Sequence, residues 1–154
     1  MHAAWYERCG PANEVLTLGE MEAPRPGPGE VLVRLRASGI NPGDAKKRAD
    51  WMGFGMGYAR VIPHSDGAGT IEEVGAGVAP CRIGEQVWVW AAQSGRPFGT
   101  AAEYVALPGE QAVTSRRAWK PGCCARASPS ACRSYASQRH TRRSRTLFFA
   151  EGDR

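Results

Sequence analysis

The sequence predicts a mainly β fold, built as a rolled antiparallel sheet with one short helix. Two observations support this prediction. Short apolar segments follow one another at close spacing, and 19 Gly and 11 Pro residues among 154 positions supply the turns between them. Only one segment carries the signals of a helix start, so the pattern favours this fold over alternating strand and helix units.

Four segments have the composition of strands. In residues 31–37, apolar side chains alternate with Arg34 and Arg36, so that one face is buried and the other meets solvent. The turn residues 26–29 precede this strand. Residues 86–91 place two tryptophans on one face and two valines on the other. The remaining strands are expected over residues 69–74 and 101–107.

The one helix is expected to begin at Asn41-Pro42-Gly43-Asp44. Asn41 can cap the helix, Pro42 suits the first helical position, and Asp44 falls in the first turn near the positive end of the helix dipole. Taken alone, an Asn-Pro step is an ordinary turn and cap, so the motif does not by itself indicate catalysis.

The charge divides the chain after residue 113. Residues 1–113 carry 10 Lys or Arg against 13 Asp or Glu, a net charge of −3, whereas residues 114–154 carry 10 against 2, a net charge of +8. The sequence has no run of 18 apolar residues and no basic start followed by an apolar stretch. We therefore expect a cytoplasmic protein that does not enter a membrane.

Three joined motifs relate the chain to a known family. VIPHSDGAGTIEEVGAGV over residues 61–78, followed by GEQVWVW and FGTAAEYVALP, resembles the zinc-independent medium-chain dehydrogenase/reductases of the quinone oxidoreductase (zeta-crystallin-like) group. The resemblance is to their N-terminal GroES-like catalytic domain, which implies a partly open β-barrel. It covers about 113 of the 154 residues, so we expect an incomplete GroES-like domain over 1–113 and no Rossmann domain.

The resemblance implies hydride transfer from NADPH to a quinone or enone, without a metal. Residues 38–44 would form the edge of the active site, with Asn41 and Asp44 as catalytic candidates and Asn41 on the nicotinamide side. Lys46 stands where many quinone reductases carry a tyrosine near the substrate. Arg96 and Phe98 are further substrate-side candidates, although their position between two strands favours a packed surface loop over a substrate contact.

Metal and dinucleotide sites are not expected. Zinc-dependent relatives carry a ligand cysteine where Asn41 stands and a ligand histidine where Ser65 stands. We interpret His64 as a turn or surface histidine, Asp66 as a loop carboxylate that accepts backbone N–H bonds, and the glycines that follow as sites of close backbone packing. Residues 75–80 lack the third glycine of a phosphate loop and are interpreted as a turn. The chain alone is therefore not expected to bind NADPH tightly.

Residues 114–154 have no helical or alternating period, and Arg, Ser and Ala dominate them. This irregular basic tail carries no RNA-binding repeat, so nucleic acid is not expected to be its partner. A reading-frame change would also explain the tail, and the chain would then be a truncated and inactive reductase domain. The alternative function is a non-enzymatic small β domain whose cationic tail binds an acidic partner. The sequence leaves the oligomeric state open.

Overall fold

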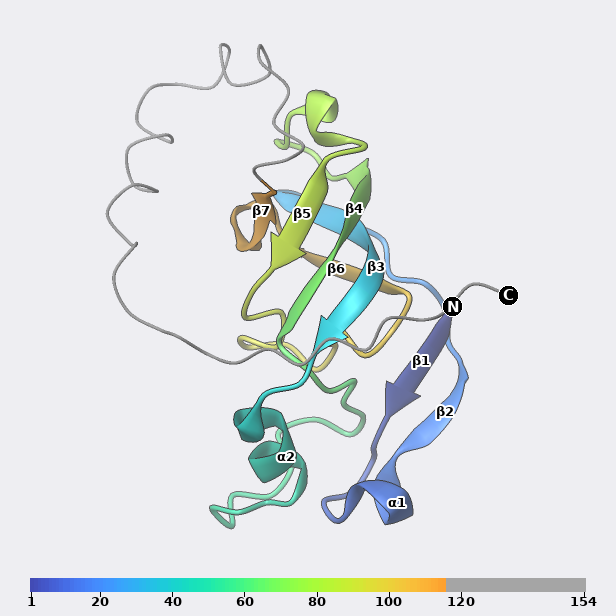
Figure 1. Cartoon of the computed structure of the whole chain (residues 1–154), viewed down its shortest axis with the longest axis vertical. Coiled ribbons are helices and arrows are strands. Elements are labelled where there is room, and N and C mark those ends of the chain that lie inside the picture. The colour runs from blue at the N-terminus through green and yellow to red at the C-terminus, as the bar shows by residue number, and fades with distance from the viewer. Residues whose placement is uncertain (116–154) are drawn as a thin grey trace.

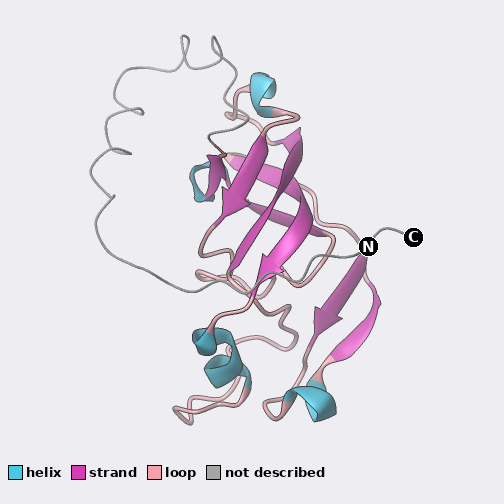
Figure 2. Cartoon of the chain, in the orientation of Figure 1, coloured by secondary structure: helices cyan, strands magenta, loops and turns pink. Residues whose placement is uncertain are grey.

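The computed structural model describes residues 1–115. Its main feature is an open five-stranded antiparallel sheet with the strand order β6-β3-β4-β5-β7 (Figures 1 and 2). The sheet consists of β3 (Glu30–Gly39), β4 (Asp66–Val74), β5 (Gln86–Val89), β6 (Tyr104–Pro108) and β7 (Ala112–Thr114). In the part of the chain that the structure describes, the edge strands β6 and β7 do not pair with each other, so the sheet stays open.

A two-stranded hairpin lies beside the lower end of this sheet in Figure 1. It consists of β1 (His2–Trp5) and β2 (Thr17–Glu20), joined by α1 (Ala12–Val15). Backbone hydrogen bonds attach it to later segments: Ala4 N–H donates to Ala101 O over 2.8 Å, and Tyr6 exchanges bonds with Val61. The longer helix, α2 (Pro42–Arg48), connects β3 to β4, and two 3₁₀ turns are η1 (Pro80–Arg82) and η2 (Gly109–Gln111).

The main hydrophobic core lies on one face of the five-stranded sheet. In β3, Val31 and Val33 are fully buried while Arg34 and Arg36 are exposed, as the alternation predicts. The valines of β5 are buried, and Trp88 and Trp90 are exposed. Nine buried residues form this core: Val31, Val33, Ile71, Val87, Val89, Ala92, Val105, Leu107 and Ala112.

Close packing between β3 and β4 depends on glycine. A Cβ atom added at Gly69 would lie 2.1 Å from the carbonyl oxygen of Arg34, far inside contact distance. β3 also has two register shifts against β4, which bend the ribbon at this point. The predicted close backbone approach at these glycines is therefore confirmed, and residues 76–78 form the turn expected there.

The mainly β prediction is confirmed, and the prediction of one helix is wrong, because the described residues contain two α-helices. α1 is a single four-residue turn that follows Pro11, and a single turn is too short to show a helical period. The strand bounds differ modestly: β4 begins earlier, at Asp66, and β6 begins later, at Tyr104. No helix within residues 1–115 is long and apolar enough to cross a membrane. Apart from residues 114 and 115, the predicted basic tail lies outside the described residues.

Candidate active site

The start of α2 follows the end of β3 and carries several hydrogen-bonded polar groups. Asn41 is the N-cap and Pro42 the first helical residue, as predicted. The backbone N–H of Asn41 donates to Asp44 Oδ2 over 2.7 Å, and the backbone N–H of Asp44 donates to Asn41 O over 2.9 Å. These bonds satisfy donors that the first turn of a helix would otherwise leave unpaired.

The side chain of Asn41 ties this helix start to β4. Its Nδ2 donates to Asp66 Oδ2 over 2.8 Å, while Asp66 Oδ1 accepts a longer bond of 3.4 Å from the backbone N–H of Ala91. Asp66 is thus the first residue of β4 and does not lie in the loop that the sequence predicted. The shorter of its two hydrogen bonds comes from the Asn41 side chain, and the longer one comes from a backbone N–H. The orientation of the Asn41 amide is fixed by this contact.

Asp44 is almost fully buried, with 5% of its surface exposed. Burial raises the pKa of its carboxyl above the usual range, and so does the nearby charge of Asp66. The Asn41 N–H, His64 and Lys47 act in the opposite direction and lower that pKa. A carboxylate so enclosed serves to position the helix start, because little of its surface is open to a ligand.

His64 lies in the same polar cluster, which the sequence did not predict. Its Nδ1 is 2.8 Å from Ser38 Oγ, and Ser38 Oγ is 3.0 Å from Thr100 Oγ1. The ring is half-buried, and the interpretation of His64 as a turn or surface histidine did not include its contact with Ser38. Burial lowers the pKa of its imidazole, Arg48 lowers it further, and Asp44 opposes both. Gly39 pairs with Asp66, so the end of β3 lies beside the start of β4. No local sequence pattern reveals this register.

A largely apolar cavity of about 470 Å³ lies against α2. Lys46 and Arg96 both line it, so the structure brings two of the predicted substrate-side residues together. The Lys46 ammonium lies 4.5 Å from the centroid of the Trp51 ring, a cation–π distance. The other lining residues are Tyr6, Gly43, Lys47, Asp50, Met52, Phe54, Gly55, Met56, Gly57, Tyr58, Val61 and Gln93.

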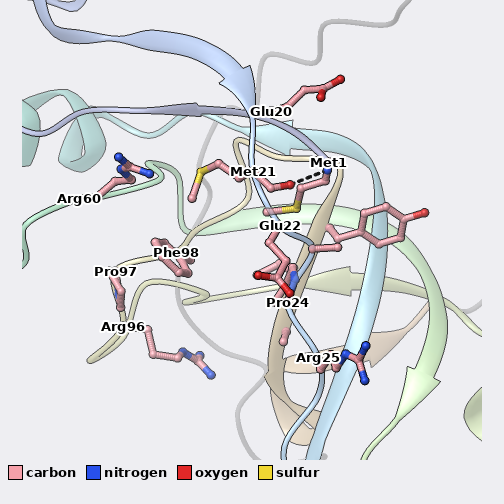
Figure 3. Close-up of a pocket in the computed structure, with 14 residues that line it drawn as sticks. Met1, Glu20, Met21, Glu22, Pro24, Arg25, Arg60, Arg96, Pro97 and Phe98 are labelled. Atoms are coloured by element: carbon pink, nitrogen blue, oxygen red, sulfur yellow. Dashed lines mark hydrogen bonds between the residues drawn. The ribbon is translucent and has the colours of Figure 1, made fainter.

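Phe98 lines a different cavity, of about 640 Å³, next to the start of the chain (Figure 3). Arg96 lines both cavities, whereas Asn41 and Asp44 line neither. In Figure 3, Arg96, Pro97 and Phe98 follow one another along one side, and the Met1 amino group donates to Met21 O over 2.6 Å on another. The predicted residues are therefore distributed over two cavities and a helix start.

The guanidinium of Arg96 is held by contacts within the protein. Its Nε donates to Ala92 O over 3.1 Å, and its Nη2 donates to Gln111 Oε1. Its Nη1 lies 3.9 Å from Glu30 Oε1, an ion-pair distance. Burial lowers the pKa of Arg96, and Glu30 opposes that effect. These contacts hold the Arg96 side chain in place where it lines both cavities.

Residues 27–117 match the family described as the alcohol dehydrogenase GroES-like domain, which is more than half of the chain. The chain belongs to this family. Within the described residues, 1–115, no group of three or more His, Cys, Asp or Glu side chains is placed to hold a metal ion.

Among similar proteins, a quinone oxidoreductase of Pseudomonas aeruginosa is 35% identical over 103 residues, which is 65% of this chain and 29% of that protein. A chloroplastic NADPH-dependent alkenal/one oxidoreductase of Arabidopsis thaliana is 30% identical over 82 residues, 51% of this chain and 21% of that protein. The solved structure of a Pseudomonas syringae quinone oxidoreductase superposes with a TM-score of 0.66 at 26% identity, covering 77% of this chain and 34% of that one. The GroES-like chain therefore spans at most about a third of these relatives.

Proposed function

We propose that this GroES-like domain supplies one wall of the active site of a reductase that passes a hydride from NADPH to a quinone or an α,β-unsaturated carbonyl, without a metal. The observation that carries the proposal is an apolar cavity of about 470 Å³ lined by Gly43 and Lys46 of α2, the helix that begins after the Asn41 cap. Apolar pockets with a few fixed polar groups are typical ligand sites. The similarity to quinone and alkenal/one oxidoreductases supports this reaction class.

NADPH, when bound, supplies the hydride. The chain fits the nicotinamide end of this cofactor because Asn41 presents a side-chain amide whose orientation is fixed by its 2.8 Å bond to Asp66. In our proposal Asn41 contacts the cofactor or the acceptor. Asp44 acts one step away as a positioning residue, since its carboxylate holds the Asn41 backbone.

Lys46 is the proposed substrate-side residue of the apolar cavity. Its ammonium lies over Trp51, and aromatic and methionine side chains line part of the same cavity and offer apolar surface to a bound ring. A cation in such surroundings stabilises negative charge that develops on an acceptor oxygen. Phe98 and Arg96 would contribute to the shape of the neighbouring cavity, and Arg96 would do so through its position more than through its charge.

The activity proposed here belongs to a complete reductase. The chain spans between 16% and 31% of the length of its curated relatives. We therefore propose that it has little or no turnover by itself and that it binds NADPH weakly. We also propose that it resides in the cytoplasm. The competing proposal, an acidic partner for the basic segment 114–154, rests on the charge of +8 in that segment.

Tryptophan fluorescence tests the cavity directly. Menadione added to the full chain is expected to quench fluorescence in a saturable manner, because Trp51 lines the cavity. Trp51→Phe should abolish the saturable part, and Lys46→Met should weaken it. Trp88→Phe is the matched control, since Trp88 is also exposed but lies on β5.

Two results would count against the proposal. Quenching that rises linearly with menadione, as in simple collisions, would contradict a quinone site. A parallel assay of quinone-dependent NADPH oxidation is expected to stay silent for this chain, and turnover would overturn the proposed lack of activity.

A further inference from the structure

The hydroxyl groups beside His64 determine which ring nitrogen carries its proton. Thr100 is fully buried, and its Oγ1 lies 2.6 Å from the carbonyl oxygen of Asp66. A carbonyl only accepts, so Thr100 donates there and has no second proton for Ser38. Ser38 therefore donates to Thr100 over 3.0 Å, and it must accept in its 2.8 Å contact with His64. Nδ1 of His64 is thus the protonated nitrogen.

The other ring nitrogen, Nε2, is consequently an unprotonated acceptor in the neutral imidazole. Within residues 1–115, the hydrogen bond of this ring to the protein is the one made by Nδ1. No buried side-chain nitrogen or oxygen in the same part of the chain lacks a partner, so Nε2 keeps contact with solvent. The Nδ1 contact holds the ring in place, and the lone pair of Nε2 stays accessible to solvent.

The backbone at His64 is held in a conformation that costs a non-glycine residue. Its φ is +74°, in the left-handed region. The carbonyl oxygen of His64 accepts the Thr100 N–H over 2.9 Å, and a Cβ added at Gly99 would lie 2.0 Å from that oxygen, so the segment has little room to relax. Strained residues fixed by their surroundings occur preferentially at functional sites.

We propose that His64 is a ligand-binding residue whose Nε2 accepts a hydrogen bond from an N–H or O–H donor of the molecule bound at the α2 edge. The inference rests on the proposed function. Two sources share this chemistry: the amide or hydroxyl groups of NADPH, and the hydroxyl of a reduced acceptor. The charged groups that act on the ring are Asp44 and Arg48 of α2, and Asp66 of β4 acts on Asp44.

The first test needs no ligand. Ring ¹⁵N spectra of the full chain, in which His64→Asn identifies one of the three histidines, should show a protonated Nδ1 and an unprotonated Nε2 at neutral pH. Ser38→Ala removes the acceptor of the Nδ1 proton and should erase this preference. A neutral His64 with its proton on Nε2 would overturn the proposal.

The second test adds NADPH and, separately, hydroquinone. At least one should shift the Nε2 resonance, and His64→Asn should weaken its binding by about tenfold, the effect of one lost hydrogen bond. Binding should also weaken when acid protonates Nε2. Asn tolerates positive φ, so the melting temperature of His64→Asn should stay near that of the native chain, and Arg36→Gln serves as the exposed control.

An Nε2 resonance that neither compound moves would overturn the inference. The backbone amide of Asn41 then separates two failures. If that amide responds to NADPH or hydroquinone while Nε2 stays silent, only the assignment of His64 fails. If both stay silent, the proposed function of this edge fails with it.

Discussion

Replacing Asn41 by Asp should destabilise the chain through a single contact. The side chains are nearly equal in size, and Asp is as good an N-cap as Asn, so the helix start itself is preserved. What changes is the 2.8 Å hydrogen bond from Asn41 Nδ2 to Asp66 Oδ2. The donor becomes a carboxylate oxygen, and two negative groups then face each other at hydrogen-bond distance.

The magnitude follows from that geometry. Two like charges about 4 Å apart interact by about 4 kcal/mol at an effective dielectric constant of 20, and the lost hydrogen bond adds about 1 kcal/mol. Both residues are half-buried and their side chains can move apart, which removes part of the repulsion. We therefore expect Asn41→Asp to lower the free energy of unfolding by about 2–4 kcal/mol at pH 7.

The effect should depend on pH with a definite sign. Two facing carboxylates raise each other's pKa in the folded state, so the folded state binds a proton more tightly than the unfolded state. The destabilisation is complete above the raised folded pKa. It shrinks as pH falls toward the unfolded Asp value of about 3.9, because a shared proton restores an O–H···O bond.

Urea denaturation at pH 7 and at pH 4.5 measures the change, with an unchanged slope and a lower midpoint expected at pH 7. Combining Asn41→Asp with Asp66→Asn reverses donor and acceptor, so the double variant should recover to within about 1 kcal/mol of the native chain. Asp66→Asn alone keeps one amide hydrogen bond and is the matched control. If the costs of the two single substitutions simply add in the double variant, the Asn41–Asp66 contact does not exist in solution.

Three further outcomes are expected. In urea denaturation, Gly69→Ala should lower the free energy of unfolding by about 1–3 kcal/mol, since the added Cβ meets the Arg34 carbonyl. Gly43→Ala in α2 is the control, because its added Cβ has no atom within 4 Å. It should raise the free energy of unfolding by about 0.5–1 kcal/mol. Burial raises the pKa of Asp44, so native stability should fall as pH rises through that pKa; Asp44→Asn keeps an acceptor for the Asn41 N–H and should flatten this slope. If the basic segment binds an acidic partner, retention on heparin should fall with salt and weaken when three residues outside the described part are changed to Gln: Arg142, Arg143 and Arg145.

Local patterns were sufficient for the parts of the fold that are set by near neighbours. Alternation around Arg34 and Arg36 predicts a half-buried strand, and β3 is one. The Asn41-Pro42 step predicts a helix start because its signals lie within four residues. The hairpin of β1 and β2 was not predicted, since each strand has only four residues and its attachment depends on distant partners such as Ala101.

The candidate site was predicted only in part for the same reason. Lys46 and Arg96 are 50 positions apart in the sequence, yet both line the cavity against α2. Nothing in the local sequence indicates that Ser38, His64 and Thr100 share a line of hydrogen bonds, because this depends on the register between β3 and β4 and on a loop that returns from β5. The roles of Asn41 and Asp44 in chemistry stay predictions.

The position of Arg96 links the two cavities, because its side chain lines both of them. Contacts with Ala92, Gln111 and Glu30 hold its guanidinium in this position. A molecule that displaces Arg96 from one side would reshape the other cavity as well. Thermodynamic linkage makes such an effect mutual: whatever factor one occupant imposes on the affinity of the second, the second imposes on the first. We therefore expect that a ligand bound in one cavity changes the affinity of the other cavity for its own ligand.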